Sequence, residues 1–335
     1  NLSNALAAGK TAAALASAPA EKMAADLQAT VLAHTEITAL DTAAKTLSTS
    51  AGEIAYSRLV LALGADPFAH GLRGDAAGEV LTVNDLADYA RFRTAIDDKV
   101  KVAVLGGGLI GCEFANDLAA AGYAVEVVHR GAWPLERLLP AEAGAALAAK
   151  LGGIGVGWHF GRSAKSAETT ATGIALTLDD DTRIDADVVL SAIGLQPRTA
   201  LAVAAGLAVG RGVQVNRLLE TSAPDVYALG DCAEVEGRNL PFVMPLMTQA
   251  RALAATLAGE PATVVYPVMP VMVKAPAYPV AVLPPAPAAA GAWTVEVEPD
   301  GVRALYHDDA GSLLGFALAG SAASQRAALA RTVAV

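Results

Sequence analysis

Cysteine is nearly absent from this chain, and its scarcity excludes several classes of protein. The 335 residues include only two cysteines, Cys112 and Cys232, which lie far apart in the sequence. That spacing excludes a disulfide scaffold, a Cys-x-x-Cys redox centre and a multi-cysteine metal or iron–sulfur site. The five histidines are also scattered without the spacing of metal ligands, so we expect no metal site.

Charge of either sign is sparse, and the balance is acidic. The chain has 24 Lys and Arg against 34 Asp and Glu, which gives a formal net charge of −10. Nucleic-acid binding draws on concentrated basic residues, so we do not expect it. The least polar stretch, 279–293, is interrupted by prolines that exclude a membrane-spanning helix. Because no export signal opens the sequence, we expect a cytoplasmic protein without a membrane partner.

Segments with helical spacing alternate with short apolar runs, a pattern that predicts the α/β class with added antiparallel strands and a separate terminal domain. Helices are expected at 1–29, 84–96, 109–121, 141–151, 245–258 and 322–331, the second capped by Asn84 with Leu86, Tyr89 and Ala90 on one face. Strands are expected at 30–40, 59–64, 101–105, 124–128, 186–193, 221–228, 264–273 and 293–316, with short strands over 155–177 and hairpins turning at 50–52 and 179–181.

A glycine-rich turn between an apolar strand and a helix is the most informative segment. Residues 102–114 read Val-Ala-Val-Leu-Gly-Gly-Gly-Leu-Ile-Gly-Cys-Glu-Phe, and a second strand follows the helix. This context supports a dinucleotide site. Gly106 permits the tight turn, Gly108 lets the backbone approach the pyrophosphate, and Gly111 allows close packing of helix and strand. The pyrophosphate is expected at the helix N-terminus.

The end of the second strand bears on the choice of nicotinamide nucleotide. An acid there would bind the ribose hydroxyls of NAD, but this chain has His129 and Arg130 instead. Arg130 could pair with a 2′-phosphate in bidentate fashion, which slightly favours NADPH over NADH. The alternative is that His129 and Arg130 are only a solvated strand end. Glu126 lies nearby, but strand alternation points it to the other face.

Four motifs occur in the order found in the FAD-dependent pyridine-nucleotide oxidoreductases, and the chain resembles that family along essentially its whole length. They are two strands ending in glycine (61–65 and 191–198), the glycine-rich turn, and 221–233, which contains Gly230-Asp231. Within the family, residues 2–6, 244–247 and especially 269–279 are similar to the rubredoxin reductases. The resemblance implies two Rossmann-like domains, for FAD and NAD(P), with added antiparallel strands, and a small C-terminal α+β domain. The implied boundaries are 1–68 with 195–264 for FAD, 69–194 for NAD(P)H, and 265–335.

Site residues follow from the resemblance position by position. Asp231 would accept a hydrogen bond from an FAD ribityl hydroxyl, Ile37 would hold the adenine edge, and Val243 would contact the flavin pyrimidine just before a helix. Glu113 and Lys274 would lie beside the flavin and nicotinamide rings, as an ion pair in one arrangement. For each of these an ordinary structural role is the alternative. The strand ends implied in cofactor contact are Ala62, Gly64, Gly194 and Gly230.

The activity implied by the resemblance is hydride transfer from NADH or NADPH to FAD, followed by single electrons passed to rubredoxin or a similar iron protein. No acid–base or nucleophilic residue is required, so none is named. Ferredoxin or the rubredoxin-like module of nitric oxide reductase are alternative acceptors, and an NAD(P)H-binding flavoprotein with a signalling role is a further reading. Both cysteines are expected to be small packing residues, outside any thiol relay.

A complete FAD domain should open with its own strand, glycine-rich turn and helix. Before Gly64 this chain has only Gly9 and Gly52. We therefore expect the leading βαβ segment to be missing in front of Asn1 and the retention of FAD to be weak.

Overall fold

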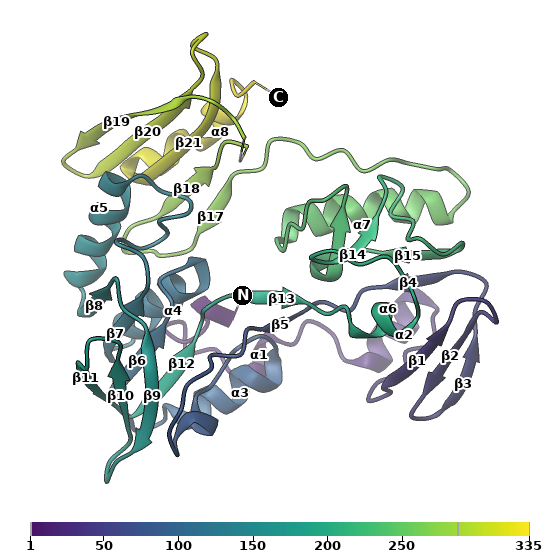
Figure 1. Ribbon diagram of the computed structural model, residues 1–335, viewed down its shortest axis with the longest axis horizontal. Coiled ribbons are helices and arrows are strands. Elements are labelled where there is room, and N and C mark those ends of the chain that lie inside the picture. The colour runs from purple at the N-terminus through teal and green to yellow at the C-terminus, as the bar shows by residue number, and fades with distance from the viewer. Residues whose placement is uncertain (1, 287, 335) are drawn as a thin grey trace. The chain divides into compact units, whose positions relative to one another are not determined.

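The computed structural model describes residues 2–286 and 288–334 (Figure 1). It divides into two compact units. Unit 1 contains the described residues up to Ala16, Ala69–Gly194 and those from Val268 onward, and unit 2 contains Ser17–Phe68 and Leu195–Pro267. The assignment of FAD and NAD(P)H domains within these units stays a prediction.

A parallel sheet forms the centre of unit 1, in the order β12-β6-β7-β8. Its strands are β6 (Lys101–Leu105), β7 (Ala124–His129), β8 (Val156–Phe160) and β12 (Val188–Ser191), with helices α4 (Leu109–Ala120) and α5 (Ala141–Gly152) between them in sequence. The predicted strand–turn–helix–strand unit is confirmed. The interior residues of β6 and all of β12 are buried, as expected for parallel strands covered on both faces.

Unit 1 also contains a three-stranded antiparallel sheet, whose strands fall between β8 and β12 along the chain. Strands β9 (Ala164–Thr169), β10 (Ile174–Leu178) and β11 (Arg183–Ala186) pair in the order β11-β10-β9, and the hairpin predicted at residues 179–181 joins β10 to β11. The strand expected at 186–193 begins later, because Ala186 ends β11 and β12 starts at Val188. Helix α3 (Leu86–Ala95) and the 3-10 turn η2 (Ala77–Glu79) precede the parallel sheet.

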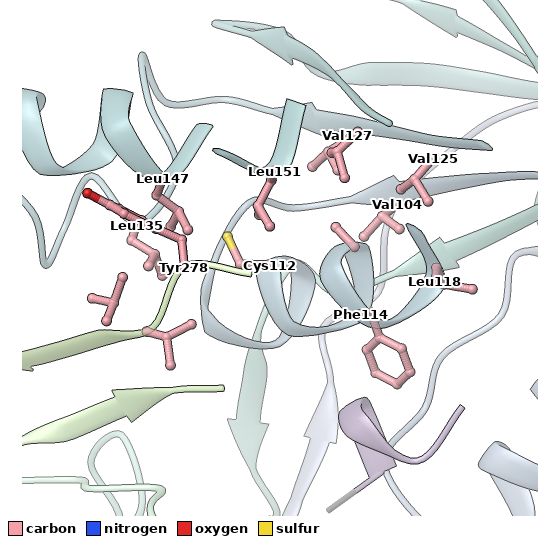
Figure 2. Close-up of a cluster of buried hydrophobic side chains, with 14 of the residues drawn as sticks. Val104, Cys112, Phe114, Leu118, Val125, Val127, Leu135, Leu147, Leu151 and Tyr278 are labelled. Carbon is pink, nitrogen blue, oxygen red and sulfur yellow. The ribbon is translucent and has the colours of Figure 1, made fainter. Parts of the chain in front are cut away.

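The C-terminal part of unit 1 is a second antiparallel sheet, in the order β17-β18-β21-β20-β19. Its strands are β17 (Val271–Val273), β18 (Val280–Leu283), β19 (Ala292–Glu298), β20 (Gly301–His307) and β21 (Leu313–Gly320). Val280 and Val302 from this sheet share one buried cluster with two leucines of α5, Leu147 and Leu151. Figure 2 labels these two leucines among other members of the cluster. This sheet is therefore packed on the dinucleotide-type α/β layer as part of the same core.

Unit 2 is built from small sheets. An antiparallel sheet contains β1 (Ile37–Asp41), β2 (Thr46–Thr49) and β3 (Gly52–Ala55), while β4 (Leu59–Leu61) pairs in parallel with β15 (Val226–Ala228). Two further pairs are β5 (Ala65–Pro67) with β13 (Leu195–Pro197), and β14 (Val213–Val215) with β16 (Ala233–Val235). The helices are α2 (Ala20–Leu27), α6 (Ala200–Ala204) and α7 (Val243–Leu257), with the 3-10 turn η3 (Gly230–Cys232).

Several predicted helices and strands have different limits for identifiable reasons. The helix expected over 1–29 is broken into η1 (Leu2–Asn4), α1 (Ala12–Leu15) and α2, because Gly9 has a positive φ and Pro19 precedes α2. The strand expected over 30–40 begins only at Ile37, after His34 with its φ of 56°. The final helix is split into η4 (Ser321–Gln325) and α8 (Arg326–Ala330).

The N-cap and the buried face of helix α3 differ from those predicted. Its N-cap is Asp85, whose side chain accepts a hydrogen bond from Asp88 N, and the predicted cap Asn84 lies one residue earlier. Leu86, expected on the buried face, is 38% exposed, whereas Tyr89 and Phe92 are fully buried.

The strand expected at 264–273 is reduced to β17, because Pro267 and Pro270 have no N–H to donate to a neighbouring strand. In the part of the chain that the structure describes, no helix is long and apolar enough to span a membrane.

Candidate nucleotide-binding sites

The glycine-rich turn of unit 1 joins β6 to α4 in a geometry that only glycine tolerates. Gly106 has a φ of 106°, and a Cβ there would collide with the Ala192 carbonyl oxygen. A Cβ on Gly111 would overlap the carbonyl oxygen of Gly106, so helix α4 packs against the turn backbone to backbone. Nothing lies within 4 Å of the Cβ position of Gly108. Gly106 and Gly111 are therefore packed against neighbouring backbone, whereas the backbone at Gly108 is accessible. A ligand that contacts the backbone of the turn needs this open space at Gly108.

The start of α4 supplies the electrostatics for such a group. Gly108 is its N-cap and offers no side-chain acceptor for the first N–H groups of the helix. These groups carry the positive end of the helix dipole, which favours a phosphate. Gly194 follows β12 with a φ of 119°, and β12 pairs with β6, so Gly194 lies at the same edge of the sheet. The residues present fit a pyrophosphate at this edge.

His129 is tied into the glycine-rich turn. Its Nδ1 accepts a hydrogen bond from Gly107 N at 3.1 Å, and Nε2 is buried without a hydrogen-bond partner among the residues described. Burial lowers the pKa of His129 and outweighs the Glu136 carboxylate and the Trp133 backbone, which raise it; Arg137 lowers it further. The imidazole is therefore neutral at pH 7, and the expectation of a cation at position 129 is wrong. A group that accepts from a backbone N–H at Nδ1 cannot hold a proton there.

Arg130 follows the last residue of β7, and Glu126 lies within the strand. Arg130 is exposed, and its guanidinium has no ion-pair partner within residues 2–286 and 288–334. Glu126 pairs with Nε2 of His159 on β8 at 2.9 Å. The Glu126 carboxylate is thus paired with a side chain of the neighbouring strand β8. Of these two side chains, Glu126 is paired with His159, and Arg130 is the one available to a ligand.

Three polar side chains on one face of α4 hold segments from distant parts of unit 1. Glu113, Asn116 and Asp117 are all at least 95% buried. Glu113 Oε1 accepts from Lys274 N at 2.9 Å, Asn116 Oδ1 from Ala277 N at 3.0 Å, and Asp117 Oδ2 from Leu6 N at 2.8 Å. Their spacing of three and four residues places them on one helix face. We call these three residues the α4 clasp.

The α4 clasp changes the role expected of Glu113 and Lys274. Glu113 contacts the backbone N–H of Lys274, and no ion pair joins the two side chains in the described part of the chain. The Glu113 carboxylate also accepts from the Ser3 hydroxyl, and Asn4 Nδ2 donates to the Lys274 carbonyl at 2.8 Å. The structure therefore brings Glu113 and Lys274 together through the backbone, in place of the suggested side-chain ion pair.

Asp117→Ala is expected to lower the free energy of unfolding by about 1–3 kcal/mol, because it leaves the buried Leu6 N–H without an acceptor. Asp117→Asn keeps an acceptor oxygen and should cost less than about 1 kcal/mol. Burial raises the pKa of Asp117, so a neutral replacement is not penalised for its lost charge. Urea unfolding of both variants checks the prediction. Equal losses in the two would contradict the hydrogen bond as their source.

Unit 2 has a second candidate site at the carboxyl edge of its parallel strands β4 and β15. Leu229 N donates to Leu61 O at 3.1 Å, so Ala62 and Gly64 after β4 lie at the same edge as Gly230 and Asp231 after β15. Gly64 and Gly230 have φ of 72° and 76°. Burial raises the pKa of Asp231, and its carboxylate accepts no hydrogen bond from any residue the structure describes. A half-buried acceptor without a protein donor fits a hydroxyl-bearing ligand.

A buried glutamine that sequence reasoning missed holds the Gly230-Asp231 turn. Gln249 of α7 is 2% exposed; its Oε1 accepts from Gly230 N at 2.7 Å, and its Nε2 donates to the Tyr266 hydroxyl at 2.7 Å. Asn239 Nδ2 donates to the Asp231 carbonyl at 2.9 Å. The backbone of the Gly230-Asp231 turn is thus held from two sides. The residue type alone carried no signal, since glutamine in a helix is most often solvated.

The two other cofactor contacts predicted in unit 2 are Val243 and Ile37, which lie in different surroundings. Val243 is the first residue of α7, after the N-cap Phe242, and is 71% exposed. The helix expected to start near Pro245 thus begins two residues earlier, because Pro245 is accommodated in its first turn, where no N–H is needed. Ile37 begins β1 and pairs with Thr49, next to a register shift before Ala39. Among the residues that the structure describes, no hydrogen bond joins Ile37 to the edge that carries Asp231.

Both cysteines are packing residues in the structure. Cys112 lies in the buried cluster of unit 1 with Leu147, Leu151 and Tyr278 (Figure 2), and Cys232 Sγ accepts from Leu63 N at 3.3 Å. Burial raises the pKa of both thiols above the ordinary value. A buried, protonated thiol is a poor nucleophile, so neither cysteine is suited to a thiol relay. Among the residues described, no cluster of His, Cys, Asp or Glu could hold a metal ion.

Fold and site together define the class: an α/β protein with a dinucleotide-type glycine turn in one unit and a glycine–aspartate turn in the other. Residues 1–255 match the family model described as "Pyridine nucleotide-disulphide oxidoreductase", and residues 263–333 match "Rubredoxin binding C-terminal domain". The chain belongs to the pyridine nucleotide-disulphide oxidoreductase family. It is therefore an oxidoreductase, and the predicted family and fold class are confirmed.

Relatives cover most of the chain. The chain is 49% identical to the rubredoxin-NAD(+) reductase of Alcanivorax borkumensis over 95% of its length and 84% of the relative's. It is 37% identical to a nitric oxide reductase FlRd-NAD(+) reductase of Aeromonas salmonicida, over 96% and 82%. A ferredoxin reductase structure from Rhodopseudomonas palustris superposes with a TM-score of 0.88 at 25% identity, covering 100% of this chain and 85% of that one.

Proposed function

We propose that the protein is an NADH-dependent flavoprotein reductase that passes electrons through FAD to rubredoxin. The observation that carries the proposal is the presence, in unit 1, of a dinucleotide-type turn and a C-terminal sheet that matches the rubredoxin-binding domain model. FAD, when bound, supplies the chemistry, because flavin accepts a hydride and releases electrons singly. The relatives named rubredoxin-NAD(+) reductase support the same donor and acceptor.

The residues of unit 1 have the parts needed to hold a nicotinamide nucleotide. The open backbone at Gly108 and the first N–H groups of α4 would hold the pyrophosphate, and the end of β7 would face the ribose. The α4 clasp fixes the helix to the loop 274–277, which lies between strands β17 and β18 of the C-terminal sheet. Glu113 would thus act by positioning Lys274 and its loop beside the first turn of α4.

The residues of unit 2 have parts that fit FAD. Asp231 offers an unsatisfied, half-buried carboxylate to a ribityl hydroxyl, and Gln249 and Asn239 hold the turn that carries it. The exposed first turn of α7 at Val243 would place N–H groups and a positive dipole end against the flavin. Because Cys112 and Cys232 are buried and protonated, electrons would leave FAD directly for the acceptor.

NADH is the proposed donor, which reverses the slight preference for NADPH that the sequence suggested. That preference rested on two cations at the end of β7, but His129 is neutral and accepts a hydrogen bond from Gly107 N. Arg130 alone remains, so one of the two cations on which the preference for a 2′-phosphate rested is lost. A cytoplasmic location is part of the proposal, since two free buried thiols fit a reducing compartment.

Anaerobic mixing tests the proposal. The protein with added FAD is mixed with NADH, then with oxidised rubredoxin, while the flavin absorbance is followed. We expect bleaching by NADH, slower bleaching by NADPH, and fast recovery with rubredoxin. Ferredoxin and the rubredoxin-like module of nitric oxide reductase serve as comparison acceptors, because relatives with the latter name reach 37% identity. Flavin reduction without any faster reoxidation by rubredoxin would contradict the proposal and favour a signalling flavoprotein.

A further inference from the structure

Arg162 lies at the nucleotide edge of the parallel sheet, where the ribose end of a dinucleotide would be. Parallel pairing places Phe160 of β8 beside His129 of β7, and Arg162 follows two residues later. Arg162 N donates to the His129 carbonyl at 3.1 Å, and Gly161 N donates to the Gly131 carbonyl at 2.9 Å. The backbone of Arg162 is thus joined to the residue that also bonds Gly107 of the glycine-rich turn.

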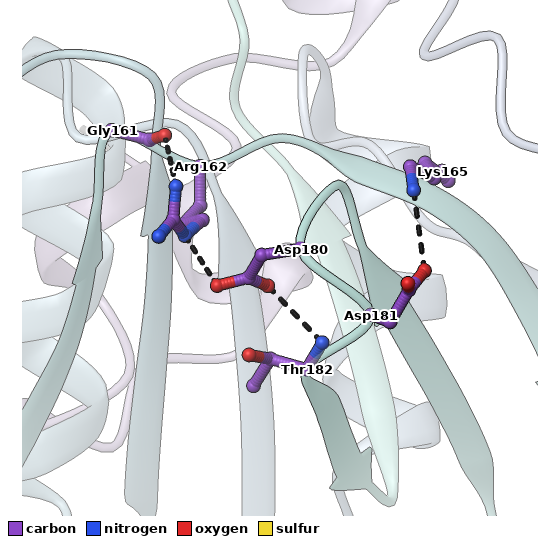
Figure 3. Close-up of polar contacts among 6 residues, drawn as sticks. All are labelled: Gly161, Arg162, Lys165, Asp180, Asp181 and Thr182. Atoms are coloured by element: carbon purple, nitrogen blue, oxygen red, sulfur yellow. Dashed lines mark hydrogen bonds and ion pairs between the residues drawn. The ribbon is translucent and has the colours of Figure 1, made fainter.

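The guanidinium of Arg162 is nevertheless directed to the hairpin between β10 and β11. Its Nε lies 2.6 Å from Asp180 Oδ2, and its Nη1 donates to the Gly161 carbonyl at 3.2 Å (Figure 3). Asp180 Oδ1 in turn accepts from Thr182 N at 3.1 Å. The hydrogen bonds from Thr182, and then the charge of Arg162, lower the pKa of Asp180, so its carboxylate is ionised at neutral pH.

We propose that Asp180 holds the Arg162 guanidinium away from the ribose and thereby disfavours a 2′-phosphate. The inference rests on the proposed function and names its specificity determinant. A second guanidinium beside the exposed Arg130 would complete a dianion site, because paired arginines bind phosphate oxygens in fixed geometry. Asp180 blocks this in two ways: it occupies the Nε donor, and its own negative charge repels the phosphate.

The adjacent aspartate provides a matched control. Asp181 pairs with Lys165 at 3.3 Å and is 87% exposed, so its carboxylate is directed to a different cation (Figure 3). Asp181 has a φ of 64°, which asparagine adopts readily. Asp181→Asn therefore removes the same unit of charge from the same hairpin without releasing Arg162. In Asp180→Asn, the amide oxygen can still accept from Thr182 N, so the hairpin is retained.

Binding of ADP-ribose and of 2′-phospho-ADP-ribose, measured by calorimetry on the full chain, tests the inference without flavin or an electron acceptor. Asp180→Asn is expected to tighten 2′-phospho-ADP-ribose by about fivefold, a modest factor because half-exposed ion pairs are weak. ADP-ribose binding should stay within about twofold. Asp181→Asn should leave the ratio of the two affinities unchanged, and Asp180→Asn combined with Arg162→Ala should return it to the parental value.

The possible results separate the inference from the proposed function. If the parent binds ADP-ribose but Asp180→Asn leaves the affinity ratio unchanged, or Asp181→Asn shifts it equally, the inference is overturned and the proposed function stands. If the gain in Asp180→Asn survives the loss of Arg162, the guanidinium is not its source and the inference is again overturned. Failure of the parent to bind either ligand would overturn both.

Discussion

Replacing Gly111 with alanine is expected to abolish dinucleotide binding and to lower the free energy of unfolding by about 3 kcal/mol or more. The added Cβ would overlap the carbonyl oxygen of Gly106, so the clash is between backbones and no side-chain rotation relieves it. Helix α4 would have to move away from β6. That movement would disturb both the buried side chains Cys112 and Phe114 and the α4 clasp. Urea unfolding and ADP-ribose calorimetry measure the two effects.

Gly108→Ala separates binding from folding at the same turn. Nothing lies within 4 Å of the Cβ position, and the φ of −80° suits alanine, so the unfolding free energy should change by less than about 0.5 kcal/mol. The methyl group would nonetheless occupy the surface that a pyrophosphate approaches, and ADP-ribose affinity should fall by about tenfold or more. Parental affinity in Gly108→Ala would show that the nucleotide does not use this backbone. Full stability in Gly111→Ala would contradict the packing argument.

The local features of the fold could be predicted from the sequence, because short-range patterns determine them. Gly106 and Gly108 follow an apolar run and Gly111 lies in the first turn of the helix, a pattern that predicts a strand, a turn and a helix from local sequence alone. The hairpins at 50–52 and 179–181 were also signalled by their turn residues. Helix limits were less accurate: Asn84 and Asp85 are both good caps, and only the structure shows Asp85 bonded to Asp88 N.

The long-range features of the site could not be predicted, because they depend on burial and on partners far away in the sequence. A histidine in isolation titrates near neutral pH and can carry a charge, whereas burial among the turn and its neighbours lowers the pKa of His129 and favours the neutral imidazole. The contacts of Glu113 with Lys274, and of Asp117 with Leu6, join residues more than a hundred positions apart. Polar residues at positions 113, 116 and 117 of a buried helix were a usable signal, since such side chains are seldom buried without partners.

Asp231→Ala is expected to weaken FAD binding by about 10- to 100-fold while leaving the unliganded protein as stable as the parent or more so. A hydrogen bond to a charged acceptor contributes about 1.5–3 kcal/mol, which sets the size of the loss. The carboxylate has no protein donor to lose, and its burial disfavours the charged form. FAD titration and urea unfolding without FAD measure the two effects. Asp225→Asn, which removes a carboxylate paired with Lys45 at 2.6 Å, is the control and should leave FAD affinity unchanged.

The pH dependence of stability provides an independent check on the same carboxyl group. Burial raises the pKa of Asp231 in the folded state above its unfolded value near 3.8, so the folded protein binds the proton more tightly. The stability contributed by that proton is fully present below pH about 4 and is lost as the pH rises through the folded pKa. Asp231→Asn has no such loss. Without FAD, its stability relative to the parent should therefore grow from pH about 4 upward and level off toward pH 7. A difference that shrank over this range would show that a protein donor satisfies the carboxylate, and Asp231 would then be a structural residue and not an open acceptor for a ribityl hydroxyl.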